Sequence, residues 1–206
     1  MPKSRYGAVL LTLCLVHPEA AVGQIQPIIT DRPDFTESPF VVPVGSLQLE
    51  TGITRETADG VTSLSGLEAL LRWSPAARIE FRFQPPGYIG GGSAQGYTDI
   101  GLGAKVELGT IRAWSLGAIA SVGVPTGSVE TSAGTVEPQL ILAAGRQFHG
   151  VWSLGTQASV ARIGEADAVR VGSTLVAGRA LTERVAAFIE VAVDRESGAD
   201  TWSVLH

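Results

Sequence analysis

Long segments in which every second residue is apolar dominate this chain and constrain its fold more than any other feature. In the first of them, Leu47, Leu49 and Ile53 alternate with polar residues. A period of two is typical of a β-strand with one apolar and one polar face. About nine such segments occur, followed by the start of another, and their length of roughly 10 residues suits a tilted membrane-spanning strand. They lie at residues 46–55, 66–73, 78–84, 99–108, 114–124, 140–148, 152–163, 169–179 and 185–193, with the partial one at 201–204.

The connections between these segments alternate in length. Outer-membrane barrels join their strands by short periplasmic turns and longer external loops in the same alternation. We therefore predict an all-β fold, an antiparallel transmembrane β-barrel with up-and-down meander topology; a soluble β-sandwich remains the alternative. The short connections are residues 74–77, 109–110, 149–150 and 182–183, and the longer ones are 85–96, 125–135, 164–168 and 194–200.

The two faces of the predicted strands differ in charge. Charged side chains facing lipid would cost several kcal/mol each at mid-membrane, so the charged parity must face a polar lumen. It is either a pore lining that selects solutes or an ion-pair network that fills the barrel. The residues predicted to face lipid are Leu49, Leu71, Phe81, Leu102, Leu116, Leu142, Leu154 and Ile189. Those predicted to line the lumen are Glu50, Glu68, Arg72, Arg78, Glu80, Arg82, Lys105, Glu107 and Glu190.

The first 23 residues have the pattern of a secretory signal peptide. Lys3 and Arg5 precede an apolar run at residues 8–16, which is too short to cross a bilayer as a helix. Small residues follow, and cleavage is expected after Gly23. Cys14, the one cysteine, lies in this segment, and a lipid anchor on it is the alternative. No later segment is expected to form a transmembrane helix.

Several classes of function are excluded by residue type. The formal net charge is −5 and basic residues do not cluster, which argues against a nucleic-acid partner. The three histidines, His17, His149 and His206, are too scattered for a metal site or a catalytic triad. The glycine-rich stretches do not precede a helix, as a phosphate-binding loop would require. We therefore expect no catalytic, cofactor-binding or metal-ligating residues, and no enzyme activity.

Two motifs at the start of the mature chain resemble a known family. They are the residues TDRPDFTES at 30–38 and VPVGSLQLETG at 42–52, with weaker matches at 97–105, 124–127 and 188–190. The sequence resembles, over essentially the whole mature chain, the outer-membrane barrel family named for the meta-pathway of phenol degradation. The resemblance implies a Gram-negative outer membrane, with its lipid and the barrel assembly machinery as partners. It also implies passage of hydrophobic or aromatic compounds and brings no catalytic residues.

Residues 24–45 are expected to form a periplasmic arm or a plug of the barrel formed by residues 46–206. As a plug, the arm would pair its charges with inward residues near the periplasmic mouth, such as Arg78, while Phe35 supplies an apolar anchor. The alternative is a plain tether. The plug residues proposed on this basis are Asp31, Arg32, Asp34, Phe35 and Glu37.

The function predicted from these patterns is a passive transporter or channel for small, hydrophobic or aromatic compounds. A structural or adhesive barrel that transports nothing is the alternative, and a secreted β-sandwich that binds ligands is a weaker one. The family's barrels continue for further strands, whereas this chain stops at His206, early in a strand. We therefore expect a fragment or truncated product whose sheet is open or strained between its first and last strands.

Overall fold

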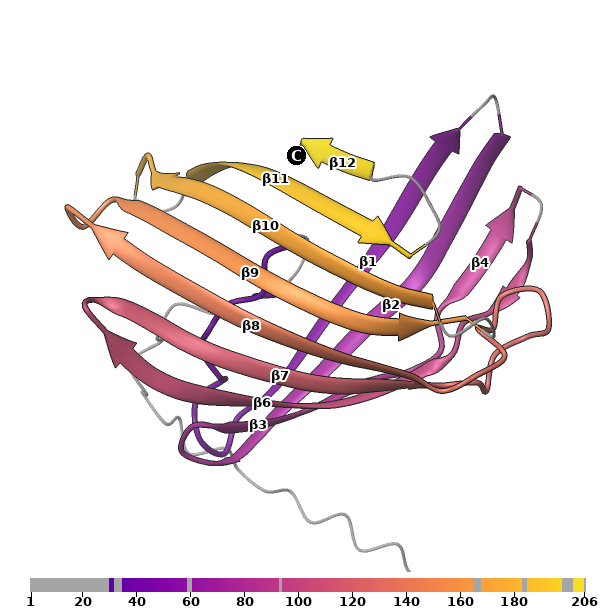
Figure 1. Cartoon of the computed structure of the whole chain (residues 1–206), viewed down its shortest axis with the longest axis horizontal. Helices are drawn as coiled ribbons and strands as arrows, with labels where there is room; N and C mark the ends of the chain where they lie inside the picture. The colour runs from indigo at the N-terminus through magenta and orange to yellow at the C-terminus, as the bar shows by residue number, and fades with distance from the viewer. Residues whose placement is uncertain are drawn as a thin grey trace, which may run out of the picture.

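The computed structural model describes residues 30–31, 35–58, 61–92, 94–164, 168–182, 185–197 and 202–205. Every regular element in this part of the chain is a β-strand, as predicted (Figure 1). None of the described segments forms a helix long and apolar enough to cross a membrane. The strands are β1 (Leu47–Ala58), β2 (Val61–Ala76), β3 (Ile79–Gln84), β4 (Tyr88–Gly91), β5 (Gly96–Tyr97), β6 (Ile100–Ile111), β7 (Trp114–Val124), β8 (Glu137–Phe148), β9 (Trp152–Ile163), β10 (Ala168–Ala180), β11 (Ala186–Glu196) and β12 (Trp202–Leu205).

The strands form one antiparallel sheet that curls into a half-barrel. From β6 to β12 each strand pairs with the next in the chain, which is the predicted up-and-down meander. Figure 1 shows these strands as a curved stack, with the long pair β1 and β2 crossing beside it. In the described residues β1 pairs only with β2 and β12 only with β11, so the sheet is open between its first and last strands, as expected.

The sheet contains 12 strands, more than the nine and a partial one that the alternation predicts. The difference lies in the connection at residues 85–96, predicted to be a long loop. It contains the small β4–β5 hairpin, which pairs with β2 at Ser63–Gly66, whereas β3 pairs with β2 nearer the opposite end. Tyr88 and Tyr97 stabilise this hairpin by an edge-to-face contact with ring centroids 5.3 Å apart. Such short elements carry too little alternation to be recognised in a sequence.

One short turn also lies elsewhere than predicted. The alternation places it at Gly109–Thr110, but β6 continues to Ile111 and the chain reverses at Arg112 and Ala113, both with positive φ. A β-bulge between Glu107 and Gly109 inserts an extra residue, and Gly109 adopts a φ of 107° there. The bulge breaks the period of two, which is why the turn is displaced.

The polarity of the two faces of the sheet is the reverse of that in a soluble protein. The largest fully buried side chains of the described residues are Arg72, Lys105, Glu80, Glu190 and Ser74, all on the concave face. Of the residues predicted to face lipid, Leu49 is 64% exposed and Ile189 is 56% exposed. Phe81, Leu102 and Leu142 are also exposed, whereas Leu71, Leu116 and Leu154 are half-buried.

Candidate channel interior

The segment that precedes β1 crosses the concave side of the sheet (Figure 1). Of the arm at residues 24–45, the structure describes 30–31 and 35–45. At one wall, the Phe35 amide donates to Oε2 of Glu190 on β11 at 3.0 Å, and the Thr36 hydroxyl donates to Oε1 of the same carboxylate at 2.6 Å. The Thr36 hydroxyl also lies 2.5 Å from that of Thr174 on β10. Inward-facing side chains of the sheet thus hold the arm by its backbone and by its side chains.

The arm returns along the opposite wall. The Val41 amide donates to Glu107 on β6, and the Val42 amide donates to Glu80 on β3, both at 2.9 Å. Between the two walls, the arm packs on β7 at Gly117, where a Cβ atom would lie 2.6 Å from the Pro39 carbonyl oxygen. Only glycine leaves room for this approach of backbone to strand.

Seven charged side chains, five of them buried and the other two partly accessible, form one group, which we call the ion cluster. Arg72 lies at its centre and is fully buried. Its Nε donates to Oε1 of Glu80 at 2.9 Å and its Nη2 to Oε2 of the same carboxylate at 2.9 Å, a bidentate pair. Its Nη1 donates to Glu50 at 2.7 Å. The members are Asp31, Glu37, Glu50, Arg72, Glu80, Arg82 and Lys105.

Two carboxyl groups of the arm complete the ion cluster. Asp31 lies 2.5 Å from Nζ of Lys105, 2.6 Å from Nη1 of Arg82 and 3.2 Å from Nη2 of Arg72. Although burial raises the pKa of Asp31, the attraction of these three cations outweighs burial and holds that pKa well below its usual range. Glu37 accepts from Nη2 of Arg82 at 2.9 Å and lies 3.4 Å from Lys105.

The structure brings together many of the residues predicted to line a lumen. Glu50, Arg72, Glu80, Arg82 and Lys105 meet in the ion cluster, and Glu107 and Glu190 bind backbone amides of the arm. Glu68, also on β2 but outside the ion cluster, accepts a hydrogen bond from the Thr54 hydroxyl.

The prediction for Arg78 is wrong. Arg78 occupies the turn between β2 and β3 with a φ of 66°, where strand alternation ends, and its side chain is exposed. The arm's described charges pair with Arg72, Arg82 and Lys105 instead. Arg32 and Asp34 lie outside the described residues, as does the predicted signal peptide at residues 1–23.

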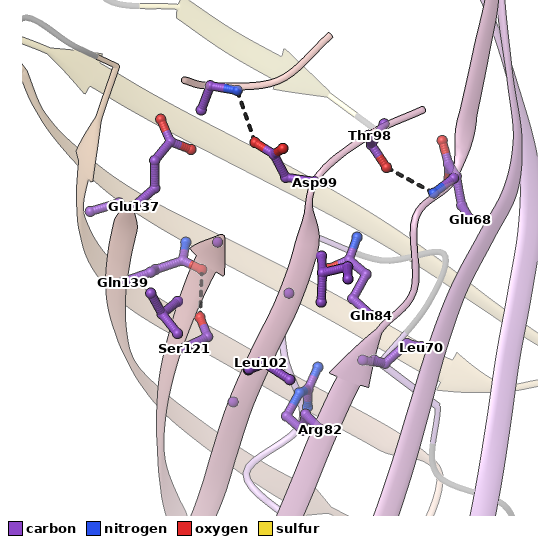
Figure 2. A pocket seen from close by; sticks show the side chains of 18 of the residues that line it. Glu68, Leu70, Arg82, Gln84, Thr98, Asp99, Leu102, Ser121, Glu137 and Gln139 are labelled. Atoms are coloured by element: carbon purple, nitrogen blue, oxygen red, sulfur yellow. Dashed lines mark hydrogen bonds between the residues drawn. The ribbon is translucent and has the colours of Figure 1, made fainter. Parts of the chain in front are cut away.

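A cavity of about 1110 Å³ lies beside the ion cluster on the concave face. Figure 2 shows Arg82 at one end of it and Thr98 and Asp99 at the other. The arm contributes Asp31, Phe35 and Glu37 to its lining. The strands contribute the apolar side chains of Leu70, Ile119 and Ile141, and the neutral polar ones of Gln84, Ser121, Gln139 and Gln157. The cavity thus offers apolar and neutral hydrogen-bonding groups beside charged side chains, which include Glu37, Glu68 and Arg82.

The connection at residues 125–136 closes over the far end of this cavity. Asp99 accepts backbone N–H groups from Thr126 at 2.9 Å, Gly127 at 2.7 Å and Ala133 at 2.8 Å. Burial raises the pKa of Asp99, but these amides outweigh it and lower that pKa below its ordinary value. Thr131 and Ala133 of the same connection line the cavity.

Comparison with known proteins identifies the family. A family model described as "Putative MetA-pathway of phenol degradation" matches residues 30–201. The chain belongs to this family. None of the curated proteins matches the chain. Among solved structures, an outer membrane channel from Pseudomonas putida F1 is similar, with a TM-score of 0.56 and 16% identity, over 86% of this chain and 79% of the channel's. This likeness concerns the fold.

Sequence reasoning missed several residues of this phenol-degradation family member that shape its interior. Asp99, at the start of the predicted strand 99–108, has no predicted role, although the motif Pro125-Thr126-Gly127 that it holds belongs to one of the weaker family matches. Thr36, Thr174 and Gln157 also bind or form the arm's docking surface. Thr36 lies in the motif at 30–38. Thr174 and Gln157 carry no such signal, because uncharged polar residues are common on the inward parity of the strands.

Proposed function

We propose that this protein is an outer-membrane β-barrel channel, without catalytic chemistry, for small hydrophobic or aromatic compounds. It reaches the outer membrane of a Gram-negative cell after cleavage of its signal peptide, with insertion by the barrel assembly machinery. The observation that carries the proposal is the cavity of about 1110 Å³ inside a sheet whose charged side chains are buried and whose apolar ones are exposed.

The outer face of the sheet supports a membrane location. Exposed side chains such as Leu49, Leu142 and Ile189 would meet water in a soluble protein and hydrocarbon in a bilayer. A face with many exposed apolar side chains is a feature of surfaces that contact lipid or another protein. Lipid is therefore the proposed partner of the convex face.

The lining of the cavity supports the proposed class of solute. Phe35, Leu70, Ile119 and Ile141 offer an apolar surface, and glutamines surround it. A small ring bearing one hydroxyl group could bury its apolar face against these side chains and retain a hydrogen bond to a glutamine. Membership of a family described by phenol degradation agrees with this class.

A second function, a structural barrel that transports nothing, is supported by the ion cluster itself. Its charges of opposite sign pair with one another and occupy the interior together with the arm. Paired charges of this kind give weak selectivity between ions. The two functions differ in the role of the arm. It is a removable plug if the protein is a channel and a permanent part of the interior if the barrel is only structural.

The test removes the arm from the full chain. Deleting residues 26–39 while retaining the signal and the strands should raise single-channel conductance in planar bilayers and speed aromatic uptake into proteoliposomes. The unmodified chain is the control, and heat-dependent migration in detergent gels verifies assembly of both. If neither protein conducts nor admits any aromatic solute while both assemble, the structural function is favoured. Recovery of the full chain as a soluble periplasmic protein would overturn both functions.

A further inference from the structure

The charges of the ion cluster do not balance when all its members are ionised. Among the described residues, three cations, Arg72, Arg82 and Lys105, meet four carboxyl groups, which leaves one negative charge in excess in a largely buried site. Burying an uncompensated charge is far more costly than burying a neutral group or a complete ion pair. One bound proton would restore the balance.

Glu37 is the member whose surroundings best fit a neutral acid. Its Oε2 is buried and has no hydrogen-bond partner, and the 3.4 Å to Lys105 is the longest contact of the arm's carboxyl groups with a cation. Burial raises the pKa of Glu37 to about 7, and the neighbouring charge of Asp31 adds to the rise, while Arg82 and Lys105 oppose it. The backbone of the same residue is anchored, since its amide donates to Gln157.

We propose that Glu37 carries the balancing proton while the arm is docked, and that loss of this proton releases the arm and opens the channel. The inference concerns regulation of the interior and rests on the proposed channel function for its consequence, although arm release itself can be measured separately. It makes the arm a gate controlled by pH in place of a fixed filling.

The direction of the pH dependence follows from the groups around Glu37. In a released arm its carboxyl would titrate near the ordinary pKa of 4.5, whereas docking raises that pKa to about 7. The docked arm therefore holds the proton more tightly, and docking weakens as pH rises from about 4.5 to about 7 and changes little above. In the part of the chain that the structure describes, the charged groups nearest Glu37 are Asp31 of the arm, Arg82 of β3 and Lys105 of β6. Further charged groups of the same interior are Glu80 of β3, Arg72 of β2, Glu50 of β1 and Glu190 of β11.

The experiment measures conductance and arm position separately, on the full chain at pH 5 and pH 8. The open probability of the unmodified protein should rise about tenfold or more, since each pKa unit corresponds to a factor of ten. Glu37→Gln, which mimics the neutral acid, should stay mostly closed at both pH values. Glu68→Gln, the same change at a cavity residue outside the ion cluster, should respond to pH as the unmodified protein does.

Two further variants separate the gate from the channel. Cysteines replacing Thr36 and Thr174, whose hydroxyl oxygens lie 2.5 Å apart, should form a disulfide that abolishes the pH response until it is reduced. Spin labels on cysteines replacing Phe40 and Val129, in a Cys14→Ser background, report arm position without any solute, because both native side chains are exposed. The distance distribution should broaden at pH 8, but not when Glu37→Gln is added.

An arm distance that stays the same at both pH values, or a Glu37→Gln protein that still responds to pH, would overturn the proton gate, whether or not the protein conducts. Arm movement without conductance or uptake in any variant would instead leave the proton-controlled docking standing and reject the channel function. The two proposals can therefore fail independently.

Discussion

Replacing Arg72 with methionine removes the cation at the centre of the ion cluster and retains most of the side-chain volume. Arg72 is fully buried and contacts Glu50 at 2.7 Å, Glu80 at 2.9 Å and Asp31 at 3.2 Å. It also donates to the Phe40 carbonyl oxygen of the arm at 3.3 Å. Methionine would leave three buried carboxyl groups without this partner.

The expected loss of unfolding free energy is about 3–5 kcal/mol, the range measured when one partner of a buried ion pair is removed. Arg170 provides the matched control, because its pair with Glu196 at 3.4 Å is partly exposed, with side chains 45% and 35% accessible. An exposed pair of this kind contributes about 0–1 kcal/mol, so Arg170→Met should change stability little.

The assay is reversible urea unfolding of the protein inserted in lipid vesicles, followed by tryptophan fluorescence and by heat-dependent migration in gels. Measurements at pH 8 lie above the range of about 4.5 to about 7 in which the pKa of Glu37 makes docking depend on pH. If Arg72→Met costs less than about 1 kcal/mol, or no more than Arg170→Met does, the ion cluster does not stabilise the fold as argued.

Two further predictions concern the outer face and the connection at residues 125–136. Leu142→Arg, on the exposed apolar face of β8, should lower the unfolding free energy in vesicles by about 2–4 kcal/mol, whereas Val129→Arg should not; equal effects would contradict a lipid-facing surface. Asp99→Asn should speed hydrogen exchange at the Thr126, Gly127 and Ala133 amides relative to Glu130→Gln, and unchanged protection would contradict the restraint. Because the pKa of Asp99 lies below its ordinary 3.8, this restraint should persist above that pH and weaken only as pH falls through the lowered pKa.

The sequence by itself determined the strands and the reversed polarity of their faces. Successive side chains of a strand point to opposite faces, so the parity of Glu80 and Arg82 against Phe81 assigns each to the interior or to the surface without knowledge of neighbouring strands. The motifs at 30–38 and 42–52 indicated the family for the same reason, because a run of consecutive residues can be recognised without knowing what surrounds it in the fold.

Only the tertiary structure decided which inward charges meet. Thr36 binds Glu190, 154 residues further along the chain, and Asp31 binds Lys105, 74 residues further along. Such pairings depend on the register of every intervening strand and on the curvature of the sheet. Both are properties of the whole fold, so no pattern of neighbouring residues predicts which charges will meet. Arg78 illustrates the limit, because a turn of two residues removed it from the interior that its neighbours Glu80 and Arg82 share. The ion cluster contains more acids than cations, and this is known only once the fold shows which residues of the arm and the strands lie together. In a buried site these charges interact strongly with one another and act as one group.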